Sequence, residues 1–240
     1  MSSDFSRDLV LRVARLAGTK AGITVAGLVH LLPLLTGNRN TCRLVMGSDA
    51  ASALAFDLGS AGLVTVLTPM SHQKLGDDWF ELSRGSNSSN IKMVVVARDN
   101  QTAEEIVDAE FNGRFRDSGR LLEYPTCCVD AYGELNEYVA YWPSYYLKRS
   151  STVSPWCNRL IYLWGACCPT GELFPCSLTC SHAVELGKSN MEALSAVGMH
   201  RLRSAICTTA QSPLRIDWNG RVHRGTPTTA SDRSMVMEQL

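Results

Sequence analysis

The distribution of cysteines is the feature that most constrains how this chain can fold. Nine cysteines occur in 240 residues, and only Cys42 lies in the first half. Seven of the others fall between residues 127 and 180, and Cys207 follows them. Thiols that only fill a core are expected to scatter along a chain. Their clustering indicates a shared task, so we expect the fold to bring several of them together.

Composition and charge favour a globular protein of the cytosol. Hydrophobic residues make up 45% of the chain and charged residues 19%, and the 23 basic side chains equal the 23 acidic ones. Such balance argues against a nucleic-acid partner. The most apolar stretch, residues 22–35, is shorter than a bilayer span of about 20 residues, and no targeting segment is evident. In a reducing cytoplasm, clustered cysteines favour metal binding or catalysis over disulfides.

The first half alternates between strand-like and helix-like segments. Residues 91–97 form the clearest strand, and Thr102 with Glu105 has the spacing of a helix capping box. This alternation predicts an α/β fold with a small mixed or parallel sheet and flanking helices. The other predicted segments are helices over 5–16, 25–35 and 50–58, strands over 42–46 and 62–68, with Pro69 ending the latter, and a loop over 83–90.

The second half is rich in aromatic residues and cysteines, and we predict that it is mainly helical. Asn219-Gly220, between β-like flanks, indicates a hairpin near the end. We therefore expect an α/β scaffold over residues 1–120, a cysteine-rich helical region packed on it over 121–225, and a flexible tail over 226–240. One continuous domain over the first two regions is the alternative.

The first cysteine motif runs from Tyr124 to Cys128. Pro125 and Thr126 form a good helix start, since proline is tolerated in the first turn and threonine can cap. Cys127 and Cys128 would then lie where free N–H groups and a partial positive charge favour an anionic thiolate.

The second motif, from Pro175 to Cys180, follows the same logic. We predict that Ser177 caps a helix over 178–197 and that Cys176 and Cys180 face the same side of its start. His182 is a possible further ligand.

Two helix starts with two thiols each can supply four soft ligands. We predict one metal centre held by Cys127, Cys128, Cys176 and Cys180, with an iron–sulfur cluster as the first expectation and zinc as the alternative. The spacing matches neither a zinc ribbon nor a ferredoxin. Small buried thiols that pack helix starts, and a redox or disulfide-forming role, remain alternatives.

The remaining candidates are weaker. We predict catalytic roles for Cys128, Tyr124 and Asp130, although a solvated helix carboxylate is the simpler interpretation of Asp130. Cys157 is predicted as core, and Cys167 and Cys168 lie in a turn where one could serve as a ligand or a resolving thiol. Core positions are predicted for Cys42, Cys207 and His30, and surface positions for His72, His200 and His223.

The two motifs resemble those of a prokaryotic family, domain of unknown function 483, which pairs a Gly-Tyr-Pro-x-Cys-Cys box with a Pro-Cys-Ser-x-x-Cys box. The similarity spans roughly residues 91–194. Glu123 stands where the family has glycine, and Leu173-Phe174 where a histidine often precedes the second box. The resemblance implies no activity, but it supports the importance of the two boxes.

These features predict a metal- or iron–sulfur-dependent enzyme that acts on a small molecule or amino-acid derivative, in sulfur transfer or biosynthetic tailoring. Three thiolates would hold the centre while one cysteine carries a persulfide or acts as nucleophile. The alternatives are a zinc-stapled binding or structural module without catalysis, and a metal-free thiol enzyme.

Overall fold

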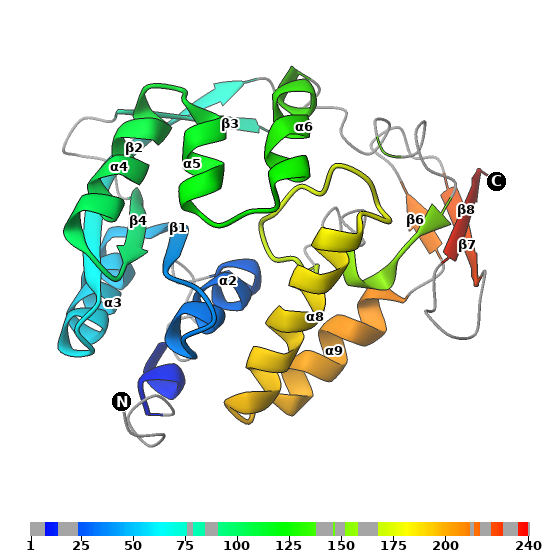
Figure 1. The fold of residues 1–240 in the computed structure, drawn as a ribbon, viewed down its shortest axis with the longest axis horizontal. Helices are drawn as coiled ribbons and strands as arrows, with labels where there is room; N and C mark the ends of the chain where they lie inside the picture. Colours follow the sequence, from blue (N-terminus) through cyan, green and yellow to red (C-terminus); the bar gives the residue numbers. More distant parts are fainter. Residues whose placement is uncertain are drawn as a thin grey trace. The chain divides into compact units, whose positions relative to one another are not determined.

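A computed structural model gives the fold of the chain (Figure 1). The chain folds into two compact units, Met1–Tyr124 and Pro125–Leu240. From the sequence, we predicted this boundary at residue 120. The described residues are 8–13, 24–75, 79–84, 91–137, 146, 152–157, 168–211, 214–216, 222–227 and 235–239.

The first unit is built on a four-stranded sheet in the order β1-β4-β2-β3. The α/β class is confirmed, but a parallel or mixed sheet is wrong, because every hydrogen-bonded strand pair is antiparallel. A helix joins β1 to β2, which run in the same direction, but β4 lies between them and opposes both. The strands are β1 (Thr41–Gly47), β2 (Val64–Leu75), β3 (Trp79–Arg84) and β4 (Ile91–Ala97).

Both faces of β4 are buried, which explains its uninterrupted apolar run. On one face, Met93 and Val95 pack against Ile106 of α4. On the other face, Val94 and Val96 are 0% exposed, and α2 and α3 contact the neighbouring strands. The helices of this unit are α2 (Val25–Leu35), α3 (Ser48–Ser60), α4 (Asn100–Phe111) and α5 (Phe115–Leu121), and residues 8–13 are also helical.

Pro69 does not end its strand, as the sequence suggested. β2 continues through it to Leu75, and Pro69 pairs with Lys92 of β4. On the other side, the described residues of β3 pair with β2 from Met70 to Leu75. Proline is tolerated where one side of a strand is unpaired, because its missing N–H can face that side.

The start of α4 also differs from the prediction. The helix begins at Asn100, and the Asp99 side chain caps it by accepting the Thr102 N–H at 2.8 Å. Thr102 is therefore inside the first turn, and the capping box with Glu105 does not form. Ser83 lies in β3 rather than in the predicted loop, whose residues 85–90 are outside the described part of the chain. His72 lies in β2 and not in a loop.

The second unit contains the predicted helices and a small antiparallel sheet in the order β5-β8-β7-β6. The helices whose bounds the structure describes are α6 (Thr126–Glu137), the short 3-10 helix η2 (Pro155–Cys157), α8 (Ser181–Ala196) and α9 (His200–Ala210), and α8 packs against α9 (Figure 1). None of the helices described in either unit is long and apolar enough to cross a membrane.

The sheet of the second unit lies partly in the predicted hairpin and partly in the predicted flexible tail. β6 (Leu214–Ile216) and β7 (Val222–Pro227) pair as an antiparallel hairpin, as Asn219-Gly220 indicated, although the turn itself is outside the described residues. β8 (Met235–Gln239) falls in the predicted flexible tail, where it pairs with β7 and with β5 (Thr152–Val153).

Candidate metal centre

The first cysteine motif forms the start of α6, as predicted. The carbonyl of Pro125 accepts the N–H groups of Cys128 and Val129 at 2.8 and 3.0 Å, which closes the first turn. Cys128 is 1% exposed, and Cys127 is half-buried. Both thiols therefore project from a helix N-terminus, where the helix dipole favours negative charge.

The second motif is a turn and not a helix start, so Ser177 is not the N-cap that we predicted. The Cys180 N–H bonds to the Ser177 carbonyl at 3.2 Å, and α8 begins only at Ser181, with Cys180 as its N-cap. The Cys180 carbonyl then accepts the Val184 N–H at 2.9 Å, the first bond of the helix. Cys176 thus approaches Cys180 through the turn rather than by helical spacing.

Contacts from outside the motif hold this turn in place. The hydroxyl of Tyr146, which is 1% exposed, donates to the Pro175 carbonyl at 2.6 Å. The Leu178 carbonyl accepts the Ser154 N–H at 2.8 Å and the Cys157 thiol at 3.0 Å. Sequence reasoning missed Tyr146, because nothing distinguishes it from the other aromatic residues of this half.

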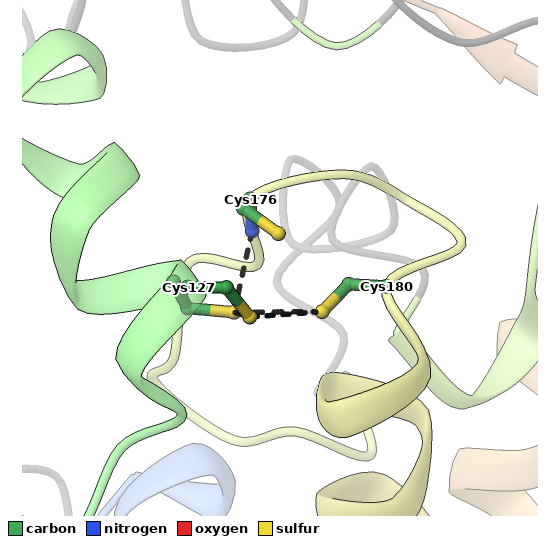
Figure 2. Close-up of side chains that lie close together, drawn as sticks. Cys127, Cys176 and Cys180 are labelled. Atoms are coloured by element: carbon green, nitrogen blue, oxygen red, sulfur yellow. Dashed lines mark hydrogen bonds between the residues drawn. The ribbon is translucent and has the colours of Figure 1, made fainter.

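The four predicted cysteines come together in the second unit. Their sulfurs all lie within 4.8 Å of one another, and we call Cys127, Cys128, Cys176 and Cys180 the thiol cluster. Cys180 Sγ lies 3.6 Å from Cys127 Sγ and 3.8 Å from Cys128 Sγ, and Figure 2 shows the labelled Cys127, Cys176 and Cys180 converging. Bonds of about 2.3 Å to one tetrahedral ion place sulfurs about 3.8 Å apart. The spacing therefore suits a single metal ion.

Burial and hydrogen bonds shift the pKa of Cys128, Cys176 and Cys180 in different directions. Burial raises the pKa of Cys128 well above its usual range, although the Cys176 N–H, 3.4 Å from Cys128 Sγ, partly offsets it. Burial and the neighbouring Cys180 thiol raise the pKa of Cys176 to about 12. Burial also opposes ionisation of Cys180, but the Ala183 N–H and the nearby thiols outweigh it and lower the Cys180 pKa. Two thiols thus keep protons that a cation would have to displace.

The other proposed site residues are placed differently. His182 lies in the first turn of α8, is exposed, and brings Nδ1 to 3.5 Å from Cys127 Sγ. Asp130 is exposed on α6 and does not belong to the thiol cluster. Tyr124 belongs to the first unit, where its hydroxyl lies 3.3 Å from His30 Nδ1 and Arg39 lies over its ring. The catalytic roles of Tyr124, Asp130 and Cys128 stay predictions.

The remaining cysteines and histidines divide between core and surface. Cys157 and Cys168 are 0% exposed, and burial raises the Cys157 pKa; Cys168 Sγ lies 3.0 Å from Thr170 Oγ1. Cys167 and the side chains of His72 and His223 are outside the described part of the chain. As predicted, Cys42 and His30 are buried and His200 is exposed, whereas Cys207 is half-buried rather than core.

Comparison with known proteins identifies a family without assigning an activity. No curated protein and no solved structure matches the chain significantly. Residues 89–197 match the family described as Protein of unknown function (DUF483), which confirms the family resemblance, and this range contains all four members of the thiol cluster.

Proposed function

We propose that the protein binds one metal ion through the thiol cluster and uses it as an enzyme on a small molecule or amino-acid derivative. The observation that carries this proposal is the convergence of four free thiols within 4.8 Å, from two segments about fifty residues apart. Four sulfurs at this spacing form a preorganised set of soft ligands. Such a set suits zinc or iron far better than magnesium or calcium.

The spacing favours a single ion over the iron–sulfur cluster that the sequence suggested first. In a cluster with four irons, each cysteine binds its own iron, so the four cysteine sulfurs lie farther apart than around one ion. The contacts of 3.6 and 3.8 Å between Cys180 Sγ and the two α6 sulfurs match one tetrahedral ion. Zinc and mononuclear iron are the candidates.

The exposure of the thiol cluster supports a role in chemistry. Cys127 and Cys176 are half-buried, whereas Cys128 and Cys180 are buried. The exposed His182 lies beside Cys127 and supplies a base or a further ligand at the same edge. A small molecule could therefore reach the centre at Cys127, where a displaced thiolate could act as nucleophile or carry sulfur.

A structural zinc staple is the second candidate, because the thiol cluster joins two elements that lie far apart in sequence. An ion there would connect the start of α6 to the turn before α8. The Tyr132 and Phe174 rings, with centroids 6.2 Å apart, already connect the same two segments. Closed four-thiolate sites are usually structural.

Metal analysis of protein purified without oxygen tests the metal site. We expect about one zinc or iron ion per chain and no acid-labile sulfide. Stoichiometric sulfide with iron would replace the single ion by a cluster, and a metal-free protein with intact fold would favour the metal-free thiol enzyme.

Access of a small molecule to the metal distinguishes the proposed enzyme from a structural zinc site. We expect free cysteine, added to cobalt-substituted protein as a small amino-acid probe, to shift the sulfur-to-cobalt absorption, because the centre is open at Cys127. An unchanged spectrum at saturating probe would contradict an open site and favour the staple.

A further inference from the structure

A fifth donor lies beside the thiol cluster. His182 Nδ1 is 3.5 Å from Cys127 Sγ, and the imidazole is exposed. His182 follows the N-cap Cys180 by two residues, so the same helix start carries both side chains. Imidazole nitrogen is, with thiolate sulfur, the commonest ligand of zinc. The protein therefore offers five donors around a site that needs four.

The surroundings of the sulfurs indicate which thiol can leave. Cys128 and Cys180 are 1% and 8% exposed, and Cys128 Sγ also accepts the Cys176 N–H at 3.4 Å. Cys127 is half-buried, and it has the imidazole of His182 within reach as a substitute. Cys127 is thus the ligand whose loss should weaken metal binding the least.

We propose that His182 is an alternative ligand that replaces Cys127, so that the centre passes between a four-thiolate form and a form with three thiolates and one imidazole. This inference rests on the metal binding proposed above. The metal–sulfur bond to Cys127 breaks with its electron pair on sulfur, and neutral His182, with its proton on Nε2, donates the Nδ1 lone pair. One negative charge leaves the coordination sphere, and Cys127 becomes a free thiolate for a small electrophilic substrate.

Alkylation of the zinc-loaded protein tests this exchange. One equivalent of iodoacetamide should react at Cys127, where sulfur forms a bond to carbon and iodide leaves with the electron pair. Zinc should stay bound in the wild-type protein, because His182 takes the vacated position. In His182→Ala the same alkylation should release zinc at least about tenfold faster. Peptide mass spectrometry locates the label, and a chromogenic zinc indicator measures release.

A pair of alanine variants provides a second, independent measurement. Cys127→Ala should still bind Co²⁺ through three thiolates and His182, and Cys127→Ala/His182→Ala should bind it at least about tenfold more weakly. His182→Ala alone should keep the four-thiolate spectrum.

Three results would overturn the exchange: equal zinc release from wild type and His182→Ala, first alkylation at another cysteine, or equal Co²⁺ affinity of the two alanine variants. Wild-type protein that binds neither Zn²⁺ nor Co²⁺ would instead overturn the proposed function itself.

Discussion

The two units of this chain build their interiors from different chemistry. In the first unit, β4 is 0% exposed from Met93 to Ala97, and the face that carries Met93, Val95 and Ala97 packs against Ile106. In the second unit, buried thiols recur around helix starts and turns, and eight of the nine cysteines lie there. An apolar core needs no cofactor, whereas a cluster of thiols can exchange protons for a metal ion. The second unit should therefore depend on metal and pH, and the first should not.

Removal of one clustered thiol should have the largest effect. Cys180→Ser should release the metal, because Cys180 Sγ lies within 4 Å of two other sulfurs at the centre of the cluster. Structural zinc contributes about 10 to 16 kcal/mol of apparent binding free energy in small domains, so most metal-dependent stability should vanish. Metal content per chain and thermal unfolding with and without a chelator measure this.

Cys42→Ser is the matched control for this substitution. Cys42 is 1% exposed in β1 of the first unit and does not belong to the thiol cluster. The same chemical change there should lower stability modestly, since it buries a hydroxyl, but it should leave metal content unchanged. Loss of metal from Cys42→Ser, or its retention in Cys180→Ser, would remove the distinction between the units.

A cavity in the apolar core should act on the first unit alone. Ile106 is 0% exposed and packs against the β4 face of the sheet, so Ile106→Ala should lower the free energy of unfolding by about 2 to 5 kcal/mol. Ile106→Val should cost only about 0.5 to 1.5 kcal/mol. Urea unfolding measures both changes, and both variants should bind metal like the wild type. A variant that folds but lacks metal would show that the two interiors are coupled.

Features of the fold that local sequence controls were predictable. The helix over Val25–Leu35 and the strand over Ile91–Ala97 have the predicted bounds, because apolar periodicity and a β-branched run act within the segment itself. The thiols of Cys127 and Cys128 could also be placed, since Pro125-Thr126 marks a helix start.

Features that depend on distant partners were not predictable in this way. The position of β4 between β1 and β2 is a matter of long-range pairing, which a strand–helix–strand pattern does not specify. The turn from Pro175 to Cys180 is held by Tyr146 and by Leu178 contacts with η2, not by a local helix signal. The sequence indicated which four thiols lie close together, but the geometry that joins them comes from tertiary contacts.

Metal affinity should rise steeply with pH. The pKa of Cys128 lies well above its usual range and that of Cys176 is about 12, so both thiols are protonated at neutral pH in the metal-free protein. Each must lose its proton to bind a cation, so these two thiols alone should increase zinc affinity about a hundredfold per pH unit, or about 2.7 kcal/mol, as a lower bound for the site. Competition with a chelator at pH 6.5 and 7.5 measures the slope. An affinity independent of pH would argue against thiolate ligands.

Close backbone packing in the second unit can be tested without substituting any cysteine. A Cβ on Gly187 of α8 would lie 2.1 Å from the Trp156 carbonyl oxygen of η2. Gly187→Ala should therefore lower the free energy of unfolding by about 2 to 3 kcal/mol. A Cβ on Gly133 of α6 would meet no atom of the described residues within 4 Å, so Gly133→Ala should instead add about 0.5 to 1 kcal/mol. Urea unfolding of the metal-loaded proteins compares the two, and equal effects would contradict the close helix contact.

The smallest expected effect concerns the end of α5 in the first unit, at the position where the family resemblance suggests glycine. The Tyr124 N–H bonds to the Gly119 carbonyl at 3.0 Å and the Glu123 N–H to the Arg120 carbonyl at 2.9 Å. This is a Schellman motif, whose C′ residue adopts a left-handed backbone and is usually glycine. Glu123 has a φ of 56°. Its side chain compensates by accepting the Asn40 N–H at 2.9 Å and the Asn40 side-chain amide at 2.6 Å.

Substitution of Glu123 separates the backbone strain from these side-chain bonds. Glu123→Ala keeps the left-handed strain and loses both Asn40 contacts and the ion pair with Arg39, so it should lower the free energy of unfolding by about 1 to 2 kcal/mol. Glu123→Gly loses the same contacts but relieves strain of about 1 to 2 kcal/mol, so its stability should stay within about 1 kcal/mol of the wild type. Urea unfolding of both variants and of Asn40→Ala gives the comparison. Since Ala and Gly differ here only in Cβ, an alanine variant as stable as the glycine variant would mean that the turn carries no strain and that the glutamate contributes only its side-chain contacts with Asn40 and Arg39.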